Sequence, residues 1–313
     1  MVLFFRFFFW SSAEKSQSFS SMHRMGVYEK KDGFYMRDYA FYNGIFTPYD
    51  ACVIPLSDRS IFFGDAVYDV ILGRNGIPYQ LDEHLDRLLE NARRIGLDDI
   101  PQRATVKEAI SSVIELSEAD CFMLYAQLSG NERRRKHLRD CGDVNILITI
   151  TAAEIPERLE TVSAITMQDD RYGYCNLKTT NLLPAVLSMS EASLSGADLA
   201  IFHKNGLVTE CSAANVSIIN NGELVTHPLD TSILPGISER NLIRVCSELG
   251  IPHLSRKFTV SEMLESDAVL ITSTTKLVKV CDRIDGVELR RGCDALTKEI
   301  FRMMSEDFVK NTQ

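Results

Sequence analysis

The residue best placed to act as a nucleophile is Lys178, which lies in the segment Arg171-Tyr-Gly-Tyr-Cys-Asn-Leu-Lys178-Thr-Thr-Asn-Leu-Leu-Pro184. Its aromatic and apolar neighbours are Tyr172, Tyr174, Leu177, Leu182 and Leu183. An apolar setting disfavours the charged ammonium form, which makes the amine a better nucleophile and suits it to form a Schiff base. A lone lysine in such a segment is more often a surface residue. The functional interpretation therefore depends on the other groups that the chain supplies.

Downstream groups complete a pattern that a pyridoxal phosphate enzyme needs. Glu210 ends a predicted strand, where its carboxylate could keep a ring nitrogen protonated; the alternative is an exposed strand-end carboxylate. Leu234-Pro-Gly-Ile-Ser238 leads into a predicted helix, whose first N–H groups can bind an anion. The candidate phosphate ligands are Ile237, Ser238, Ser273, Thr274 and Arg87. Because hydroxyl clusters are also common in ordinary loops, each of these ligands is weak evidence alone.

A cationic run, Arg133 to Arg139, offers a site for a substrate carboxylate. Arg135 and His137 are two residues apart, so in an extended loop they share one face. With Tyr68 they could clamp an α-carboxylate, since an arginine fork matches its two oxygens. The alternative is a solvated basic patch.

The elements that must position these groups follow from hydrophobic periodicity and turn residues. In the first half we expect a hairpin, a β-rich run, two helices and two strands. The hairpin covers 34–47 with a turn at Asn43-Gly44, and the β-rich run covers 54–71 with a later turn at Asn75-Gly76. The first helix is capped by Asp82 and closed by Gly96, and the second is opened by a Thr105–Glu108 capping box and ends near Leu116. The two strands cover 121–128 and 144–151. The cationic run falls between these two strands.

In the second half, strands and helices alternate. Lys178 lies between a strand over 162–168 and a helix over 184–194. Two hairpins follow, with strands 198–203, 207–211, 216–219 and 223–226, then a helix from Ser238 to near Gly250, a strand over 268–272 and a helix over 294–309. The chain breaks its pattern at 152–158, so we predict a small N-terminal α/β domain over 26–154 and a larger C-terminal domain over 155–313.

Composition restricts the function classes. The chain has 313 residues, a net charge of −9 and eight cysteines without CxxC or metal-ligand spacing. A pI near 5.3 argues against nucleic acid as the main partner. The cysteine pattern indicates reduced thiols in a cytoplasmic compartment and no metal site.

Residues 1–25 are set apart from the fold prediction. Val2–Trp10 is apolar except for Arg6, and a serine-rich stretch follows. The apolar run is too short to span a bilayer, and no cleavage site of the secretory type follows it, so we expect no membrane association. We expect a disordered leader; the alternatives are an organelle-targeting peptide or translation from Met22 or Met25.

Six ordered motifs, covering about residues 38 to 290, together resemble the class IV, fold type IV pyridoxal-phosphate aminotransferases. They are 63–68 (FGDAVY), 82–88 (DEHLDRL), 176–183 (NLKTTNLL), 208–210 (VTE), 234–237 (LPGI) and 273–275 (STT). The resemblance implies an α+β fold, pyridoxal 5′-phosphate as cofactor and a homodimer with shared active sites. It also implies that Lys178 is the Schiff-base lysine, Glu210 the partner of the ring nitrogen and Leu234 a packing contact of the ring, with the phosphate on Arg87, Ile237, Ser238, Ser273 and Thr274.

Within the family, Lys-Thr-Thr-Asn-Leu-Leu is similar to the D-amino-acid aminotransferase branch. The resemblance implies transamination between a D-amino acid, such as D-alanine or D-glutamate, and a 2-oxo acid such as 2-oxoglutarate, with Arg135 and His137 of the neighbouring subunit on the carboxylate. A branched-chain L-amino-acid aminotransferase and an aminodeoxychorismate-type lyase are the alternatives. The departures from the branch are Gly130 for arginine, Ala66 for glycine, Asp69 for glutamate, Cys211 for glycine and Ser238 for threonine.

Overall fold

Six strands in the first half of the chain form an antiparallel sheet. The computed structural model describes residues 38–131, 135–138, 142–289 and 293–313, so the predicted leader lies outside the described residues. In the spatial order β2-β1-β6-β5-β3-β4, the sheet contains β1 (Tyr39–Tyr42), β2 (Ile45–Pro48), β3 (Ala66–Arg74), β4 (Ile77–Pro78), β5 (Cys121–Gly130) and β6 (Val144–Ala152). The predicted turns at Asn43-Gly44 and Asn75-Gly76 are confirmed, and all four of their residues have positive φ.

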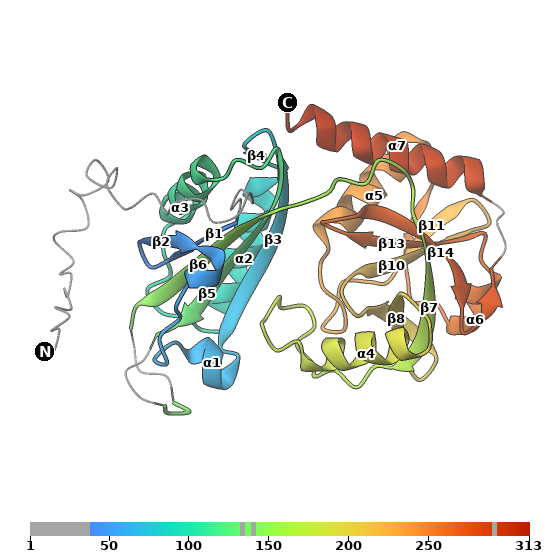
Figure 1. Cartoon of the computed structure of the whole chain (residues 1–313). Coiled ribbons are helices and arrows are strands. Elements are labelled where there is room, and N and C mark those ends of the chain that lie inside the picture. Colours follow the sequence, from blue (N-terminus) through green and yellow to red (C-terminus); the bar gives the residue numbers. More distant parts are fainter. Residues whose placement is uncertain (1–37, 132–134, 139–141, 290–292) are drawn as a thin grey trace, which may run out of the picture. The chain divides into compact units, whose positions relative to one another are not determined.

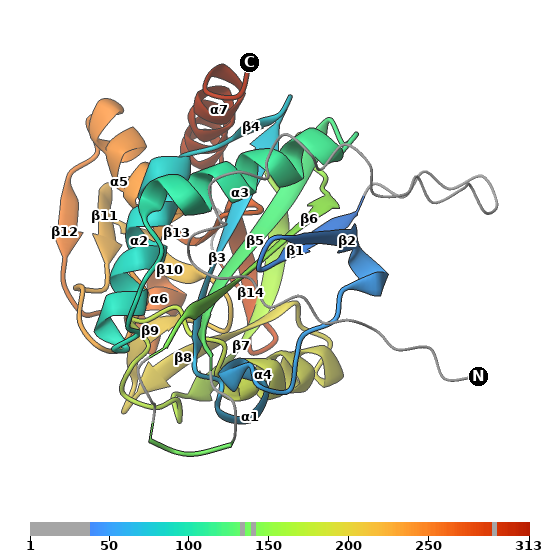
Figure 2. The same cartoon turned by 90° about the vertical axis from the view of Figure 1, so that its left-hand side faces the viewer.

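Two helices, α2 (Leu81–Arg94) and α3 (Arg103–Leu116), cover one face of this sheet (Figure 2). The predicted apolar stripe of α2 is buried there. The predicted caps were wrong. Gln80 precedes α2 in a left-handed conformation, while Asp82 lies in the first turn and accepts a hydrogen bond from Arg103 at 2.9 Å. Thr105 lies inside α3, because the helix begins two residues earlier, after an extended Gln102.

Two short helical segments were not predicted in this half: η2 (Tyr49–Ala51), a 3-10 turn, and α1 (Arg59–Phe63). Asp58 caps α1 by accepting a hydrogen bond from Ser60 N at 2.9 Å, and Gly64 ends it in the left-handed region. An Asp-Arg-Ser start followed by a glycine is a cap signal, but the apolar residues between them favoured a strand.

The second half forms a mixed nine-stranded sheet (Figure 1). Its strands are β7 (Thr161–Gln168), β8 (Leu199–Lys204), β9 (Leu207–Cys211), β10 (Asn215–Asn220), β11 (Glu223–Thr226), β12 (His253–Ser255), β13 (Ala268–Ser273), β14 (Leu277–Ile284) and β15 (Val287–Glu288). β7 runs parallel to both β14 and β8. Both predicted hairpins are confirmed as β8–β9 and β10–β11, whereas β12, β14 and β15 were not predicted.

Four helices pack on this sheet: α4 (Leu183–Leu194), α5 (Ile237–Glu248), α6 (Val260–Glu265) and α7 (Asp294–Lys310). α5 and α7 lie against each other over β13 and β14, and α4 lies against β7 and β8 (Figure 1). The α+β class is therefore confirmed. The described residues belong to one compact unit, and the division at residue 154 stays a prediction. Among the described helices, none is long and apolar enough to cross a membrane.

Candidate active site

The Lys178 segment is fixed to the first sheet by backbone hydrogen bonds. Tyr68 N donates to Lys178 O at 2.9 Å, and Thr180 N donates to Ala66 O at 3.1 Å, so the segment forms a bridge to β3. Asn181 adds a side-chain tie, since its Nδ2 donates to Gly64 O at 2.9 Å. A Cβ on Gly64 would lie 2.2 Å from Asn181 Oδ1, so the close approach requires glycine. These contacts place a residue of the second half against the sheet of the first.

The Lys178 side chain is partly buried, and its Nζ lies 4.5 Å from the centre of the Tyr68 ring. Burial, with a smaller contribution from the positive charge of Arg87, lowers the pKa of Lys178 from 10.5 to about 8. A substantial fraction of the amine is therefore neutral near physiological pH, as a nucleophile or a general base requires.

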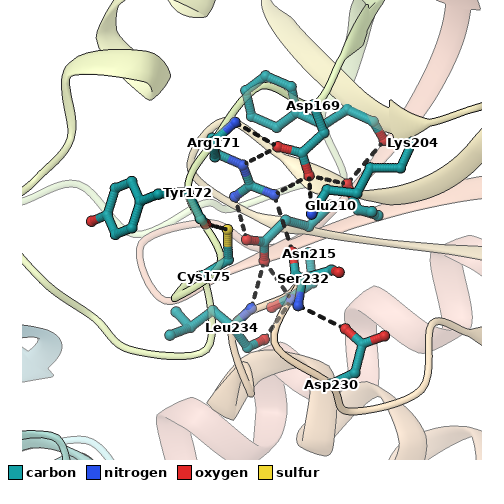
Figure 3. Close-up of polar contacts among 12 residues, drawn as sticks. Asp169, Arg171, Tyr172, Cys175, Lys204, Glu210, Asn215, Asp230, Ser232 and Leu234 are labelled. Carbon is teal, nitrogen blue, oxygen red and sulfur yellow. Dashed lines mark hydrogen bonds and ion pairs between the residues drawn. The ribbon is translucent and has the colours of Figure 1, made fainter.

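Glu210, on β9, meets a buried arginine (Figure 3). Arg171 Nη1 donates to Glu210 Oε1 at 2.5 Å, and the other side of the guanidinium donates to Asp169 through Nε and Nη2, both at 2.9 Å. The Arg171 guanidinium carbon also lies 4.5 Å from the centre of the Phe202 ring. Because both carboxylates share one cation, the guanidinium is held in a fixed plane beside Glu210.

The second oxygen of Glu210 is held by the loop before α5. Leu234 N donates to Glu210 Oε2 at 2.9 Å, and Asn215 Nδ2 lies 3.3 Å from the same oxygen. Burial raises the pKa of Glu210 to about 7, although Arg171 and the Leu234 amide oppose the shift. A carboxyl poised near neutrality can share a proton with a nearby base, as an acid partner of a ring nitrogen must.

The N-terminus of α5 borders the same cavity. Gly236 precedes the helix and makes no side-chain cap, which leaves the first N–H groups of the helix available to a ligand. Ser273 and Thr274 lie nearby at the end of β13, and Thr272 Oγ1, which is buried, has no hydrogen-bond partner. A buried hydroxyl without a partner beside an open helix N-terminus is a suitable environment for a phosphate oxygen.

Arg87 is positioned by a carboxylate within β3. Its Nε and Nη2 donate to the two oxygens of Asp69, both at 2.8 Å, and its Nη1 donates to Pro235 O at 2.9 Å. His84 Nδ1 lies 2.7 Å from Asp69 Oδ1. Burial alone would raise the pKa of Asp69, but the charge and hydrogen bonds of Arg87 hold it below its ordinary value. The ion pair thus presents an arginine to the α5 end of the cavity.

A cavity of about 820 Å³ brings most of the predicted site residues together. The predicted residues that line it are Tyr68, Arg87, Lys178, Glu210, Leu234, Ile237, Ser238, Ser273 and Thr274. Arg135 and His137 do not line it within a single chain; both are exposed, next to the aromatic rings of α1. The residues present fit pyridoxal phosphate. The amine of Lys178, the carboxyl of Glu210 and an anion-binding helix N-terminus beside an unpartnered hydroxyl share one cavity of suitable size.

Several residues of the site were not predicted. Arg171 and Asn215 hold Glu210, Asp169 holds Arg171, and Asp69 holds Arg87. Glu239 was also missed: it is 4% exposed in the first turn of α5, and its pKa is raised to about 8 by burial and by Glu210. A charged residue inside an apolar strand, as at position 69, was the signal that could have identified a buried ion pair.

The sequence and the fold were compared with those of known proteins. Residues 66–282 match the family model described as Amino-transferase class IV. The D-alanine aminotransferase of Bacillus licheniformis is 33% identical over 278 residues, which cover 87% of this chain and 97% of that protein. More than half of the chain therefore matches the family.

Solved structures of the same family share the fold. A branched-chain aminotransferase from Thermoproteus uzoniensis, solved with norvaline, superposes with a TM-score of 0.81 at 22% identity and covers 88% of this chain and 96% of that one. The branched-chain amino acid aminotransferase of T.th., complexed with N-(5′-phosphopyridoxyl)-L-glutamate, gives a TM-score of 0.79 at 19% identity over 87% and 94% of the two chains. At these identities the likeness confirms fold type IV and does not distinguish substrates.

Proposed function

We propose, from the premise that this chain belongs to the class IV aminotransferases, that it transfers an amino group from a D-amino acid to a 2-oxo acid with pyridoxal 5′-phosphate as cofactor. The donor class is D-alanine or D-glutamate, and the acceptor is of the 2-oxoglutarate type. The observation that carries the proposal is the single cavity shared by Lys178, Glu210 and the N-terminus of α5.

The cofactor would lie between these three groups. Pyridoxal phosphate, when bound, supplies an aldehyde that takes up the amino group and a ring that withdraws electrons from the substrate Cα. Arg87, the α5 amides and the hydroxyls of Ser273 and Thr274 would hold its phosphate, and Leu234 would pack on its ring. Glu210, held by Arg171, would keep a proton on the ring nitrogen.

Lys178 would be the proton-transfer group of the reaction. Its pKa of about 8 would allow the amine to accept a proton from the substrate Cα and to donate it to the cofactor carbon that carries the amino group, and to make the reverse transfer in the second half of the cycle. Tyr68, whose ring lies beside the amine, and the partly apolar cavity wall would limit the access of water to the amine.

The similarity to the D-alanine aminotransferase of Bacillus licheniformis and the sequence Lys-Thr-Thr-Asn-Leu-Leu at 178–183 support a donor of the D-configuration. A coupled assay with D- and L-alanine, each with 2-oxoglutarate, tests it on the full chain. We expect turnover with D-alanine and little with L-alanine. Turnover confined to L-leucine or L-valine would favour the branched-chain alternative, and release of pyruvate from aminodeoxychorismate without an acceptor would favour the lyase.

A homodimer with shared active sites would complete the site. Within one chain, Arg135 and His137 are exposed and do not reach the cavity. In addition, α4 exposes an apolar face beside the cavity, with Leu183, Val186, Leu187 and Leu194 each at least 56% exposed. An apolar patch of this kind marks an interaction site. A second copy would cover it and bring Arg135 and His137 to the substrate carboxylate.

Mixing two inactive variants tests the shared site. Lys178→Ala removes the amine, and a double Arg135→Ala, His137→Ala variant removes the carboxylate ligands. If each cavity takes its amine from one chain and its ligands from the other, unfolding and refolding the two together restores about a quarter of wild-type activity, from random pairing. No recovery, with heterodimers present on a native gel, would refute the shared site.

The compartment is a further part of the proposal. None of the seven cysteines in the described residues forms a disulfide, and those on β9, α5 and β14 are buried. Reduced buried thiols are typical of a reducing compartment, and we propose a cytoplasmic location. Fractionation of cells that express the full chain, with an antibody to its C-terminal end, tests this location.

A further inference from the structure

The structure assigns to Arg59 the role of a positioning residue that holds the Arg135–His137 segment in place, and to Gly130 the role of leaving room for it. The inference rests on the proposed function, in which Arg135 and His137 bind the substrate carboxylate. It adds a residue that lies outside the cavity and touches neither cofactor nor substrate within its own chain.

Arg59 binds the backbone of the segment directly. It is 5% exposed, and it donates from Nη1 to Lys136 O at 2.7 Å and from Nη2 to His137 O at 3.2 Å. Its Nε donates to Asp65 Oδ2 at 2.6 Å, which fixes the plane of the guanidinium. A buried, bidentate guanidinium imposes one geometry on the peptide it holds.

An aromatic platform on α1 supports the side chains of the same segment. The guanidinium of Arg59 lies 4.5 Å from the centre of the Phe63 ring, and that of Arg135 lies 5.2 Å from the same ring. The His137 ring is also 5.4 Å from Phe63. Arg135 and His137 are therefore placed by contacts of their own chain, although both are exposed.

Gly130 is the residue that allows this arrangement. A Cβ at position 130 would lie 3.1 Å from Arg59 Cδ and 3.4 Å from Asp65 Oδ2. A Cβ there would press on Arg59 Cδ, while its distance to Asp65 Oδ2 would be that of an ordinary contact. The glycine, which departs from the arginine usual in the branch, is thus explained: the buried guanidinium of Arg59 fills the space beside it.

The platform is also connected to the lysine segment. The carbonyl of Gly64, which ends α1, accepts hydrogen bonds from Asn181 Nδ2 at 2.9 Å and from Thr180 Oγ1 at 3.2 Å. The N-terminal end of α1 is fixed by Asp58, whose Oδ2 accepts from Tyr42, Ser129 and Asn145. A platform that is anchored at both ends in this way orients a binding loop with little loss of entropy when the substrate arrives.

Amino donors with and without a carboxylate test the role of Arg59. Arg59→Met should lower kcat/KM for the D-amino acid by roughly tenfold to a hundredfold, mainly through KM, because misplaced ligands bind the carboxylate poorly. Turnover of an amine donor that lacks a carboxylate should stay within about twofold, since that donor does not use Arg135. Equal losses with both donors would show a general structural defect and overturn the inference. Arg59→Lys should recover part of the lost KM.

Complementation separates this inference from the proposed function. Because Arg59 acts through the segment of its own chain, an Arg59→Met chain refolded with a Lys178→Ala chain should regain activity with the KM of the wild type. The role of Arg59 would be overturned, and the shared site left intact, if Lys178→Ala chains regained activity with Arg135→Ala, His137→Ala chains but not with Arg59→Met chains. Failure of both mixtures would overturn the shared site itself.

Gly130→Ala is the second variant, in which Arg59 is retained. The added Cβ pushes on Arg59 Cδ, so we expect the same pattern of higher KM and preserved amine turnover, with a smaller amplitude. Glu115→Ala, at an exposed position on α3 away from the cavity, is the control. An unchanged KM in Gly130→Ala would show that the space beside Arg59 is not needed to position the Arg135–His137 segment.

Discussion

Arg171 donates a hydrogen bond of 2.5 Å to Glu210, and the same guanidinium is bound on its far side by Asp169. Asp169 and Arg171 lie in the loop after β7, and Glu210 lies on β9 (Figure 3). Two carboxylates around one buried arginine leave Glu210 only partly neutralised, so its proton affinity is set by the balance between burial and this cation.

Arg171→Met should therefore shift the pH dependence of the reaction. Without the cation, burial is less opposed, and the pKa of Glu210 should rise above about 7. Because Glu210 acts as an anion, the acidic limb of the kcat/KM profile should move to higher pH by about one pH unit or more. Arg93→Met, at an exposed position on α2, is the control, and a limb that stays in place in Arg171→Met would contradict the assignment.

Glu210→Gln should separate cofactor binding from turnover. The amide has the size of the carboxyl and can still accept the hydrogen bond of Leu234 N, but it cannot carry a negative charge. We expect the cofactor to remain bound and kcat to fall by roughly a hundredfold or more. Absorbance of the purified variant measures bound cofactor, and a normal kcat would show that another group tunes the ring.

The rate at which the apoprotein takes up pyridoxal phosphate should rise with pH. The neutral amine is the nucleophile, and its pKa is lowered from 10.5 to about 8, so uptake should increase through a midpoint near pH 8 and level off above it. Stopped-flow absorbance measures the rate. Lys178→Ala should show no borohydride-stable attachment of the cofactor at any pH, whereas Lys298→Ala, exposed on α7, should behave as wild type.

Asp69→Asn should weaken both the fold and the phosphate site. Asp69 is fully buried, and its loss as an anion leaves Arg87 with an uncompensated charge. Breaking a buried pair on one side lowers the free energy of unfolding by about 3 kcal/mol, which urea denaturation measures. The affinity for pyridoxamine phosphate should fall with it. Asp86→Asn, at an exposed position of the same helix as Arg87, should change neither quantity appreciably.

Glu239→Gln should stabilise the apoprotein at alkaline pH. The pKa of Glu239 rises from 4.5 to about 8 on folding, so its stabilising contribution is complete below pH 4.5 and is lost as the pH rises through 8. The amide removes that loss, and we expect the unfolding free energy of the variant at pH 9 to exceed that of wild type by on the order of 3 kcal/mol. If the unfolding free energies of the variant and the wild type depended on pH in the same way, ionisation of Glu239 would not destabilise the fold.

Residues that act through local chemistry could be predicted from the sequence. Lys178, Glu210 and Gly236 were selected because each lies in or next to a junction that a periodicity or a turn defines, and the structure brings all three to one cavity. Both Asn-Gly hairpins of the second sheet were correct for the same reason, since a left-handed turn restricts the residue types.

Residues that act through distant pairing could not be predicted. Asp69 and Arg87 are 18 positions apart, and Arg171 and Glu210 are 39 apart, so only the folded chain brings each pair together. The predicted cap of α2 was wrong because Asp82 lies in the first turn and pairs with Arg103, and that of α3 was wrong because the helix begins two residues before Thr105. Glu239 was missed because nothing in the sequence indicates that its helical turn is buried.

The bridge between the Lys178 segment and β3 consists of main-chain groups alone, and this has a practical consequence for protein engineering. The Tyr68 N to Lys178 O and Thr180 N to Ala66 O bonds use no side-chain atom, so a substitution at Tyr68, other than proline, removes neither donor nor acceptor. The cavity wall can therefore be redesigned for bulkier donors while the reactive nitrogen keeps its anchorage.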